Sequence, residues 1–379
     1  MHRKGISRAR FLAGAAAAGV AGAAGPLLTT GRAEAAVTAT GARHRRGLTY
    51  RGVCYEVGEG ETPATGWNAA RMREDIRVIK EELHAGSISV FGDGIDRLSA
   101  TSTEAAEHGL HVWLQPRLGD VPEREILDHL AETGRHAERL RRHGAEVHLS
   151  VGCEFVLFVP GIVPGEDVLE RIENLLNGTF DPEQMMRRLR SFIARAAAVG
   201  RSVFRGRLTY GAAQDDDVDW GLFDIVSVNY YSYFPRRADY VRELTPYRRW
   251  GKPVVISEFG SCTYVGAPEQ GGMGWNVVDY DKKPEEIIGD LVRSERTQAA
   301  YLTDVLDVYE SMGLYAAMVY NFVSPDAPHR PEPRFDLDMA SYSITKTIKK
   351  DPGDPSSTWH WEPKDSFHAL ARHYRRAGC

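Results

Sequence analysis

Two glutamates in this chain could do chemistry together, because each follows a short apolar run. Glu258 comes near the end of residues 253–260 (Pro-Val-Val-Ile-Ser-Glu-Phe-Gly), and Glu154 near the end of residues 147–155 (Val-His-Leu-Ser-Val-Gly-Cys-Glu-Phe). Short β-branched runs bounded by proline or glycine are typical of buried strands. We therefore expect both carboxyl groups to lie where strands end.

Two carboxyl groups in one pocket can cleave a glycosidic bond. One protonates the leaving oxygen, and the other attacks the anomeric carbon or activates water. We predict that Glu154 and Glu258 face each other across one pocket and hydrolyse an O-glycosyl bond. Their separation tests the mechanism, since about 5–5.5 Å implies retention and about 6.5–9.5 Å implies inversion.

The elements that must position these glutamates alternate along the chain. Helical patterns separate nearly all of the apolar runs; the first helix, for example, carries Met72, Ile76, Ile79 and Leu83 on one face. Alternation of this kind implies parallel strands, and eight units fit a (β/α)8 TIM barrel, which builds its active site at the strands' carboxyl ends. The predicted strands are 48–55, 87–91, 111–115, 147–155, 208–211, 223–231, 253–260 and 315–322.

A doubly wound α/β sheet is the structural alternative. It would need a phosphate-binding glycine loop after the first strand. Residues 56–61 read Glu-Val-Gly-Glu-Gly-Glu, and three glutamates there would repel a phosphate. Residues 147–154 also favour the barrel, because small or polar side chains alternate with branched aliphatic ones that can pack against helices.

The first 35 residues have the composition of an export signal. A basic start precedes an Ala/Gly-rich apolar run over 12–28 and the cleavage pattern Ala33-Glu34-Ala35. Residues 7–12 resemble the twin-arginine motif with Ala9 in place of the second arginine, so that route and general secretion both stay open, as does an uncleaved anchor. We predict a signal over 1–35, a linker over 36–46, one barrel domain over 47–379 with insertions after strands four and seven, and a secreted or cell-envelope location.

Net charge and cysteine spacing limit the classes of partner that this chain is suited to bind. The chain has a net charge of −5, and removing residues 1–35 would take away five basic residues and one acidic one. Such an acidic protein is poorly suited to bind nucleic acid or an anionic membrane. The four cysteines show no zinc-ligand spacing. We expect a carbohydrate substrate, no cofactor, no metal, and no nucleic-acid or membrane partner after signal removal.

Several stretches resemble a known group of enzymes. Residues 152–155 (Gly-Cys-Glu-Phe), 223–228, 253–260, 271–275 (Gly-Gly-Met-Gly-Trp) and 336–342 together resemble the clan-A glycoside hydrolases, and more closely a group of exported actinobacterial proteins labelled "abortive infection protein". The clan resemblance implies a barrel with Glu154 as acid/base and Glu258 as nucleophile, and therefore a retaining mechanism. It also implies that Tyr230 or Tyr231 takes the tyrosine role beside the nucleophile.

Two departures from the clan pattern concern the sugar. Cys153 replaces the asparagine that usually precedes the acid/base, and Tyr320-Asn321-Phe322 stands where a tryptophan platform is usual. Aromatic rings near strand ends fit a sugar site, because rings pack on the apolar faces of pyranosides. The substrate-binding candidates are Cys153, Tyr230, Tyr231, Tyr264, Trp275, Tyr320, Asn321 and Arg117, the last of which is also a potential ion-pair partner of a strand-end glutamate.

Three rival functions need weighing. A metal-dependent barrel enzyme would need His, Asp and Glu at several strand ends, whereas His111 and His148 fall at strand starts. A Ser-His-Asp hydrolase would need a G-x-S-x-G elbow, which the sequence lacks. A catalytically silent barrel that binds envelope polysaccharide is the alternative that the sequence leaves open. The sugar, the linkage and endo or exo action are not specified by these residues.

Overall fold

The computed structural model describes residues 47–214 and 216–377 and confirms the predicted barrel. Eight parallel strands form one sheet in the order β5-β4-β3-β2-β1-β10-β7-β6. The predicted signal (1–35) and linker (36–46) lie outside the described residues. The barrel strands are β1 (Tyr50–Glu56), β2 (Ser87–Gly92), β3 (His111–Pro116), β4 (Val147–Cys153), β5 (Leu208–Gly211), β6 (Val226–Asn229), β7 (Val254–Phe259) and β10 (Ala316–Val319).

Strands β5 and β6 bring the sheet close to a closed barrel. Ala212 pairs in parallel with Val228 just beyond β5, and the Asn229 amide donates to the Ala212 carbonyl at 2.8 Å. Register shifts between Ser150 and Cys153 and between Val228 and Asn229 disturb the pairing at the carboxyl ends. Such irregularities re-aim side chains beside functional sites, and both flank a candidate glutamate.

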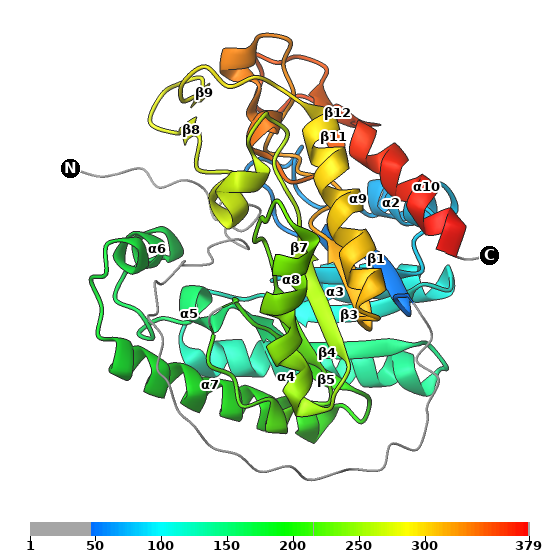
Figure 1. Cartoon of the computed structure of the whole chain (residues 1–379), viewed down its shortest axis with the longest axis vertical. Helices are drawn as coiled ribbons and strands as arrows, with labels where there is room; N and C mark the ends of the chain where they lie inside the picture. Colours follow the sequence, from blue (N-terminus) through cyan, green and yellow to red (C-terminus); the bar gives the residue numbers. More distant parts are fainter. Residues whose placement is uncertain (1–46, 215, 378–379) are drawn as a thin grey trace.

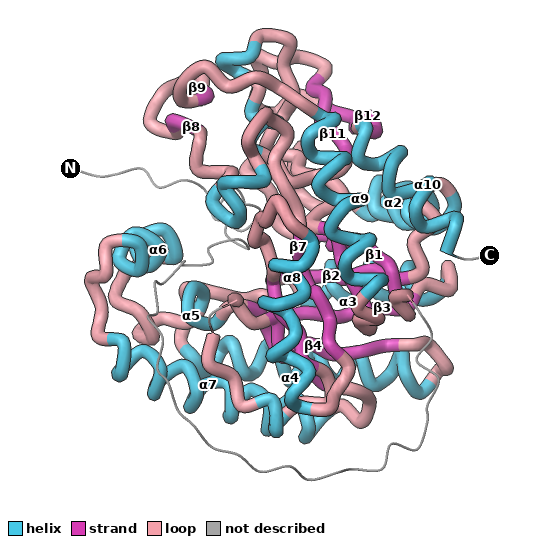
Figure 2. The backbone as a smooth tube through the Cα atoms, viewed as in Figure 1, coloured by secondary structure: helices cyan, strands magenta, loops and turns pink. Residues whose placement is uncertain are grey.

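Helices surround the central strands (Figure 2). Polar caps begin several of them, as when Asn68 accepts from two backbone amides of α2 and Asp181 caps α7 just before Pro182. None of the helices in the described part of the chain has the length and apolar character needed to cross a membrane. The main helices are α2 (Ala69–Glu81), α3 (Ile95–Glu107), α4 (Glu123–Arg142), α7 (Pro182–Val203), α8 (Arg237–Leu244), α9 (Glu295–Ser311) and α10 (Asp365–Ala377).

The chain leaves the barrel in three excursions. After β4 come α5 (Phe155–Phe158) and α6 (Val168–Leu176), and after β7 comes a short pair, β8 (Val278–Asp279) with β9 (Glu286–Ile287). After β10, the antiparallel hairpin of β11 (Thr345–Lys349) and β12 (Trp359–Pro363) occupies a segment for which the sequence predicted no regular structure. The excursions after β7 and β10 gather at one end of the molecule, at the top of Figure 1.

One predicted helix is only partly α-helical. The segment 240–250, which follows the predicted sixth strand, reads in the sequence as a single helix, but in the structure α8 ends at Leu244 and a 3-10 helix follows over Thr245–Trp250. Pro246 lies at the start of that second helix and has no amide hydrogen to continue the α-helical ladder. The tighter 3-10 turns then lead to Gly251, whose φ of 63° ends the helix.

A buried ion-pair cluster joins the excursions to the last helix. Lys364 lies between β12 and α10, is fully buried, and pairs with Asp338 at 2.8 Å. Its ammonium also donates to the Thr263 hydroxyl, beyond β7, at 2.9 Å. Arg293 pairs with the second Asp338 oxygen at 2.8 Å. Each buried charge thus has an opposite charge beside it, as burial requires.

Replacing Lys364 with methionine is expected to lower the free energy of unfolding by about 3 kcal/mol, because it leaves the buried Asp338 carboxylate with one cation fewer. Urea unfolding of the full chain measures the change. The exposed Lys350 offers a matched control, and Lys350→Met should shift the free energy by less than about 0.5 kcal/mol. Equal effects of the two substitutions would contradict a stabilising role for the cluster.

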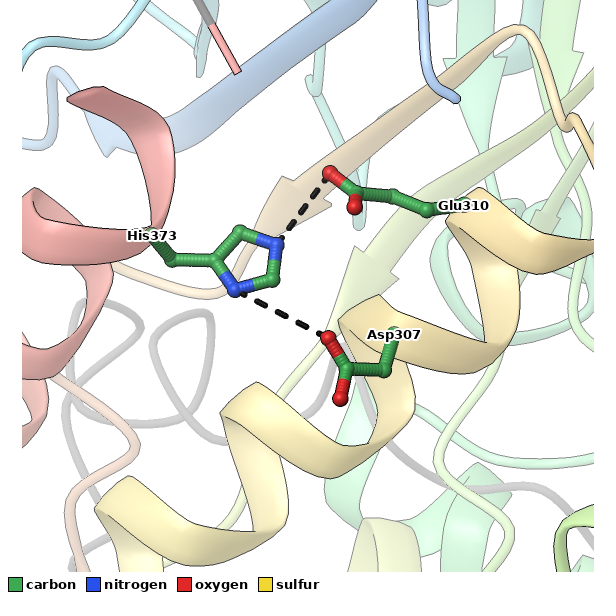
Figure 3. Close-up of side chains that lie close together, drawn as sticks. All are labelled: Asp307, Glu310 and His373. Atoms are coloured by element: carbon green, nitrogen blue, oxygen red, sulfur yellow. Dashed lines mark hydrogen bonds and ion pairs between the residues drawn. The ribbon is translucent and has the colours of Figure 1, made fainter. Parts of the chain in front are cut away.

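A second contact holds α10 against α9. His373 reaches Glu310 with Nε2 at 3.1 Å and Asp307 with Nδ1 at 4.0 Å (Figure 3). Within the described residues, these three side chains are the one His/carboxylate group close enough to consider a metal ion. However, Arg51 already donates to Glu310 at 2.6 Å and Arg237 to Asp307 at 3.1 Å. We therefore assign this group to helix packing.

Candidate active site

Glu154 is the first residue after β4 and has an unusual backbone. Its φ of 38° and ψ of 54° lie in the left-handed region, which non-glycine residues seldom adopt. The backbone is held there because its amide donates to the Gly211 carbonyl at 2.8 Å and its carbonyl accepts from the Leu157 amide at 2.8 Å. The chain therefore turns sharply from strand to helix at this glutamate, whose side chain remains inside the protein at 1% exposure.

Asn229, at the end of β6, orients the Glu154 carboxyl group. Its side-chain amide donates to Glu154 Oε1 at 3.0 Å and to Cys153 Sγ at 3.2 Å. Its own oxygen accepts from the Ser257 hydroxyl at 2.8 Å, which fixes the orientation of the amide. Glu154 Oε2 is buried without a hydrogen-bond partner among the described residues. One carboxyl oxygen is therefore fixed, and the other can carry a proton for a ligand.

Glu258 lies inside β7, one residue before the strand ends, and is 1% exposed. Arg117 donates to Oε1, and the Tyr231 hydroxyl donates to Oε2 at 3.1 Å. Arg117 also donates to Gln115 Oε1 at 2.7 Å, so β3 residues hold the guanidinium in place. Cys153 Sγ lies 3.7 Å from Glu258 Oε1 and supplies a weak third donor.

Different neighbouring groups influence the pKa values of Glu154 and Glu258. Burial, and then the nearby Glu258 carboxylate, raise the pKa of Glu154 well above its usual range. Burial also raises the pKa of Glu258, but the Arg117 guanidinium and the donated hydrogen bonds oppose that shift. Burial raises the pKa of the Cys153 thiol as well, so it stays protonated. When the pair shares one proton, we place it on Glu154.

The structure brings four of the other candidates to this pair. Arg117, Cys153 and Tyr231 contact Glu258 directly. The Tyr320 ring stacks on Phe91 with 5.8 Å between centroids and lies 6.5 Å from the Tyr231 ring. The ring of Phe91 also lies under the Arg117 guanidinium, 4.1 Å from centroid to carbon. The aromatic rings of Phe91, Tyr231 and Tyr320 therefore lie around Glu258.

Three candidates lie elsewhere. Tyr230 points away from Tyr231, as neighbours on an extended chain do, and donates to Glu243 while its ring packs near those of Tyr240 and Tyr309. Tyr264 donates to the Gly274 carbonyl at 2.9 Å. The Asn321 amide donates to the Val323 carbonyl at 3.2 Å. The remaining candidate, Trp275, lines a cleft beside the pair.

This cleft lies beyond the ends of β1 and β10. Its volume is about 960 Å³, including the open space at its mouth. Glu154 and Glu258 are not part of its lining. Tyr342 connects the two regions, because it lines the cleft and its ring lies 5.5 Å from the Tyr231 ring. The lining is rich in aromatic and charged side chains: Glu56, Trp67, Arg71, Trp275, Tyr280, Asp326, Tyr342 and Trp359.

Tyr342 is held in place by the glycine-rich segment that follows β7. Its hydroxyl donates to the Gly271 carbonyl at 2.7 Å and accepts from the Gly274 amide at 3.1 Å. Residues 271–274 therefore control how far this ring can move. Tyr342 thus lies between the cleft, which it lines, and Tyr231, which donates to Glu258.

Sequence reasoning missed several of the residues that complete the site. Asn229 and Gln115 both sit at strand ends, which was the available signal, but nothing in a single strand shows which residue it will face. Tyr342 lies in a segment whose motif was noticed only for its family resemblance. Glu56 was noticed as an acid that follows the first strand, without a role.

The two strand-start histidines form an aromatic cluster at the other end of the barrel. The His111 ring stacks on Tyr50 at 3.9 Å between centroids and lies 4.3 Å from the His148 ring. Burial lowers the pKa of His111 to about 2 and that of His148 to about 4, so both stay neutral at physiological pH. This position, away from the carboxyl ends of the strands, gives the metal-dependent alternative no support.

Comparison with known proteins identifies the fold. No family profile matches the chain, and no curated protein matches it in sequence. The resemblance to proteins labelled "abortive infection protein" is thus unsupported. Solved structures do match: a GH113 beta-1,4-mannanase has a TM-score of 0.54 and 15% identity, covering 86% of this chain and 99% of that one.

Two further solved structures share the barrel. A GH2 beta-galacturonidase from Eisenbergiella tayi has a TM-score of 0.52 and 18% identity, covering 87% of this chain and 51% of that one. A b-glucuronidase from Ruminococcus gnavus has a TM-score of 0.52 and 13% identity, covering 86% and 50%. Our chain thus spans about half the length of these two proteins. At these identities the likeness shows the (β/α)8 fold.

Proposed function

We propose that this protein is a glycoside hydrolase in which Glu154 is the acid/base and Glu258 is the nucleophile. The observation that carries the proposal is the pair itself: two buried carboxyls at the ends of β4 and β7, linked through Cys153 and Asn229, with opposing influences on their pKa values. Glycosidases need one carboxyl that holds its proton and one that gives it up. The named activities of the structural neighbours support a glycosidase activity.

A retaining mechanism fits the close contacts around Glu258. Cys153 precedes Glu154 in the chain, and its sulfur lies 3.7 Å from Glu258 Oε1. Both Glu258 oxygens already accept hydrogen bonds, from Arg117 and Tyr231. A carboxylate held in this way is oriented to attack an anomeric carbon, and Tyr231 can stabilise it as a leaving group when water later releases the sugar.

We further propose that the sugar enters through the cleft. Because both glutamates are 1% exposed, the ring of Tyr342 must turn or the 271–274 segment must move before a sugar reaches Glu258. Aromatic side chains of the cleft would hold neighbouring sugar units. The export signal predicted over residues 1–35 suggests a glycan of the cell envelope or outside the cell as the substrate.

The test is turnover of a panel of bacterial wall glycans and aryl glycosides in water enriched in oxygen-18. Hydrolysis breaks the bond between the anomeric carbon and the leaving oxygen, so the label should enter the anomeric hydroxyl of the new reducing end, as read by mass spectrometry. The double variant E154Q/E258Q should release no product above background. Unsaturated product without label would instead indicate an elimination reaction and reject hydrolysis.

A catalytically silent barrel is the second candidate, favoured by the burial of both carboxyls and by Cys153 at the usual asparagine position. In that case the protein and the double variant would bind the same glycan with similar affinity, and neither would release labelled product. Binding measured by calorimetry beside the turnover assay distinguishes the two functions.

A further inference from the structure

Arg71, on the first turn of α2, is a charged group of the cleft with no role in the proposed chemistry. Its guanidinium carbon lies 3.7 Å from the centre of the Trp359 ring. Trp359 is itself fixed, because its indole nitrogen donates to the Ala64 carbonyl at 2.6 Å. The guanidinium therefore rests on a fixed aromatic ring contributed by β12.

The guanidinium makes no hydrogen bond or close ion pair within the described part of the chain, although Arg71 is half-buried. Asp75, one turn further along α2, is the main nearby acid. Both of its oxygens are already engaged, by Trp361 at 2.7 Å and by the Tyr55 hydroxyl at 2.8 Å. Arg71 lines the cleft with its guanidinium donors unpaired by the described side chains, so they can bind a partner that enters from outside.

The other acids of the cleft, Glu56 and Asp326, do not act on the pKa of Arg71. Arg117, Asp326, Asp93 and Glu258 influence the pKa of Glu56, whereas Asp75 is the one acid that influences the pKa of Arg71. Burial raises the pKa of Glu56 to about 8, so this carboxyl is largely neutral at pH 7. Glu56 is therefore coupled to the site of the glutamate pair, whereas Arg71 is a separate cationic group of the cleft.

We propose that the cleft binds an acidic sugar residue, whose anionic group pairs with the Arg71 guanidinium over Trp359. The planar fork of arginine matches a carboxylate, sulfate or phosphate through two parallel hydrogen bonds. The ring of the acidic sugar would lie among Trp67, Tyr280 and Trp275, which line the same cleft. This inference rests on the proposed function, and it names the substrate as an acidic glycan.

Binding rather than turnover tests this inference, so its failure is separate from that of the hydrolase assignment. Uronic-acid oligosaccharides are titrated by calorimetry into the full chain carrying E258Q, beside the same oligosaccharides after carboxyl reduction. Sulfated and phosphorylated counterparts form two further arms. An acidic ligand should bind about 10-fold or more tightly than its neutral form, the size expected for a charged hydrogen-bonded pair.

Arg71→Met should abolish that preference, and Arg71→Lys, which keeps the charge without the fork, should keep part of it. Arg73 is a matched control, since it lies on the same helix with a side chain 62% exposed and outside the cleft lining. Arg73→Met should leave the preference intact. The arm that responds to Arg71 identifies the anion. Equal binding of charged and neutral forms, or a preference that survives Arg71→Met, would overturn the proposal, as would no binding in any arm.

Discussion

Glu258→Gln is expected to lower turnover by about 10³-fold or more on every substrate, including activated aryl glycosides. The amide keeps the shape of the side chain but cannot attack the anomeric carbon. The loss should not depend on the leaving group, because a nucleophile is needed whichever group departs. Initial rates across a series of aryl glycosides measure it.

A smaller replacement at the same position gives a sharper result. Glu258→Ala opens space for azide, which should attack the anomeric carbon in place of the carboxylate as the C–O bond breaks. The glycosyl azide formed should have the opposite anomeric configuration to the substrate, which nuclear magnetic resonance can read. An azide product of unchanged configuration would place the nucleophile elsewhere.

Both substitutions remove a charge beside the buried Arg117, so their effect on folding must be separated from chemistry. Glu138 is a suitable control, because it is 7% exposed and pairs with Arg141 and Arg142 on α4, outside the site. Glu138→Gln should leave turnover nearly unchanged even where it lowers stability. A loss of activity in Glu138→Gln as large as in Glu258→Gln would mean that stability explains both.

The sequence was sufficient to predict the barrel because its strands carry a local signal. Buried parallel strands are continuous apolar runs, and helices separate them with their own period. The stretches ending at Glu154 and Glu258 had this form, so the prediction of strand-end carboxyls needed no long-range information. Boundaries were less accurate, as for the strand predicted over 223–231, of which β6 keeps 226–229.

The partners of the glutamates could not be predicted in the same way, because they depend on how distant strands align. Asn229 meets Glu154 only because β5 and β6 pair at Ala212 and Val228, close to a register shift. The same shift determines which of two adjacent tyrosines faces Glu258, and the structure selects Tyr231. A single strand contains no information on the register of its neighbour.

The hairpin of β11 and β12 could not be predicted from the sequence for a different reason. The run Thr-Lys-Thr-Ile-Lys at 345–349 alternates buried and partly exposed side chains, but five residues of mixed polarity are a weak signal. Its pairing with β12 places Trp359, from the last part of the chain, against Arg71 of α2. The cleft is therefore a property of the tertiary structure, and local sequence patterns indicated only one of its aromatic side chains, Trp275.

Glu154→Gln is expected to produce a loss that depends on the leaving group, in contrast to Glu258→Gln. Glutamine cannot donate a proton, so glycosides with poor leaving groups should lose about 10²- to 10⁴-fold in rate. Aryl glycosides with acidic phenols need no protonation to depart and should form the glycosyl-enzyme nearly as fast as before. Pre-steady-state release of the phenol measures that step.

The pH dependence follows from the same assignment. Because burial raises the pKa of Glu154 well above its usual range, the acid keeps its proton at neutral pH and loses it as the pH rises. The alkaline decline of kcat/KM should therefore disappear in Glu154→Gln, whereas the decline at low pH, where Glu258 gains a proton, should remain.

Azide added to Glu154→Gln should give a glycosyl azide of unchanged configuration, since Glu258 has already inverted the centre once. A glycosyl azide of inverted configuration would mean that Glu154 is the nucleophile and Glu258 the acid/base.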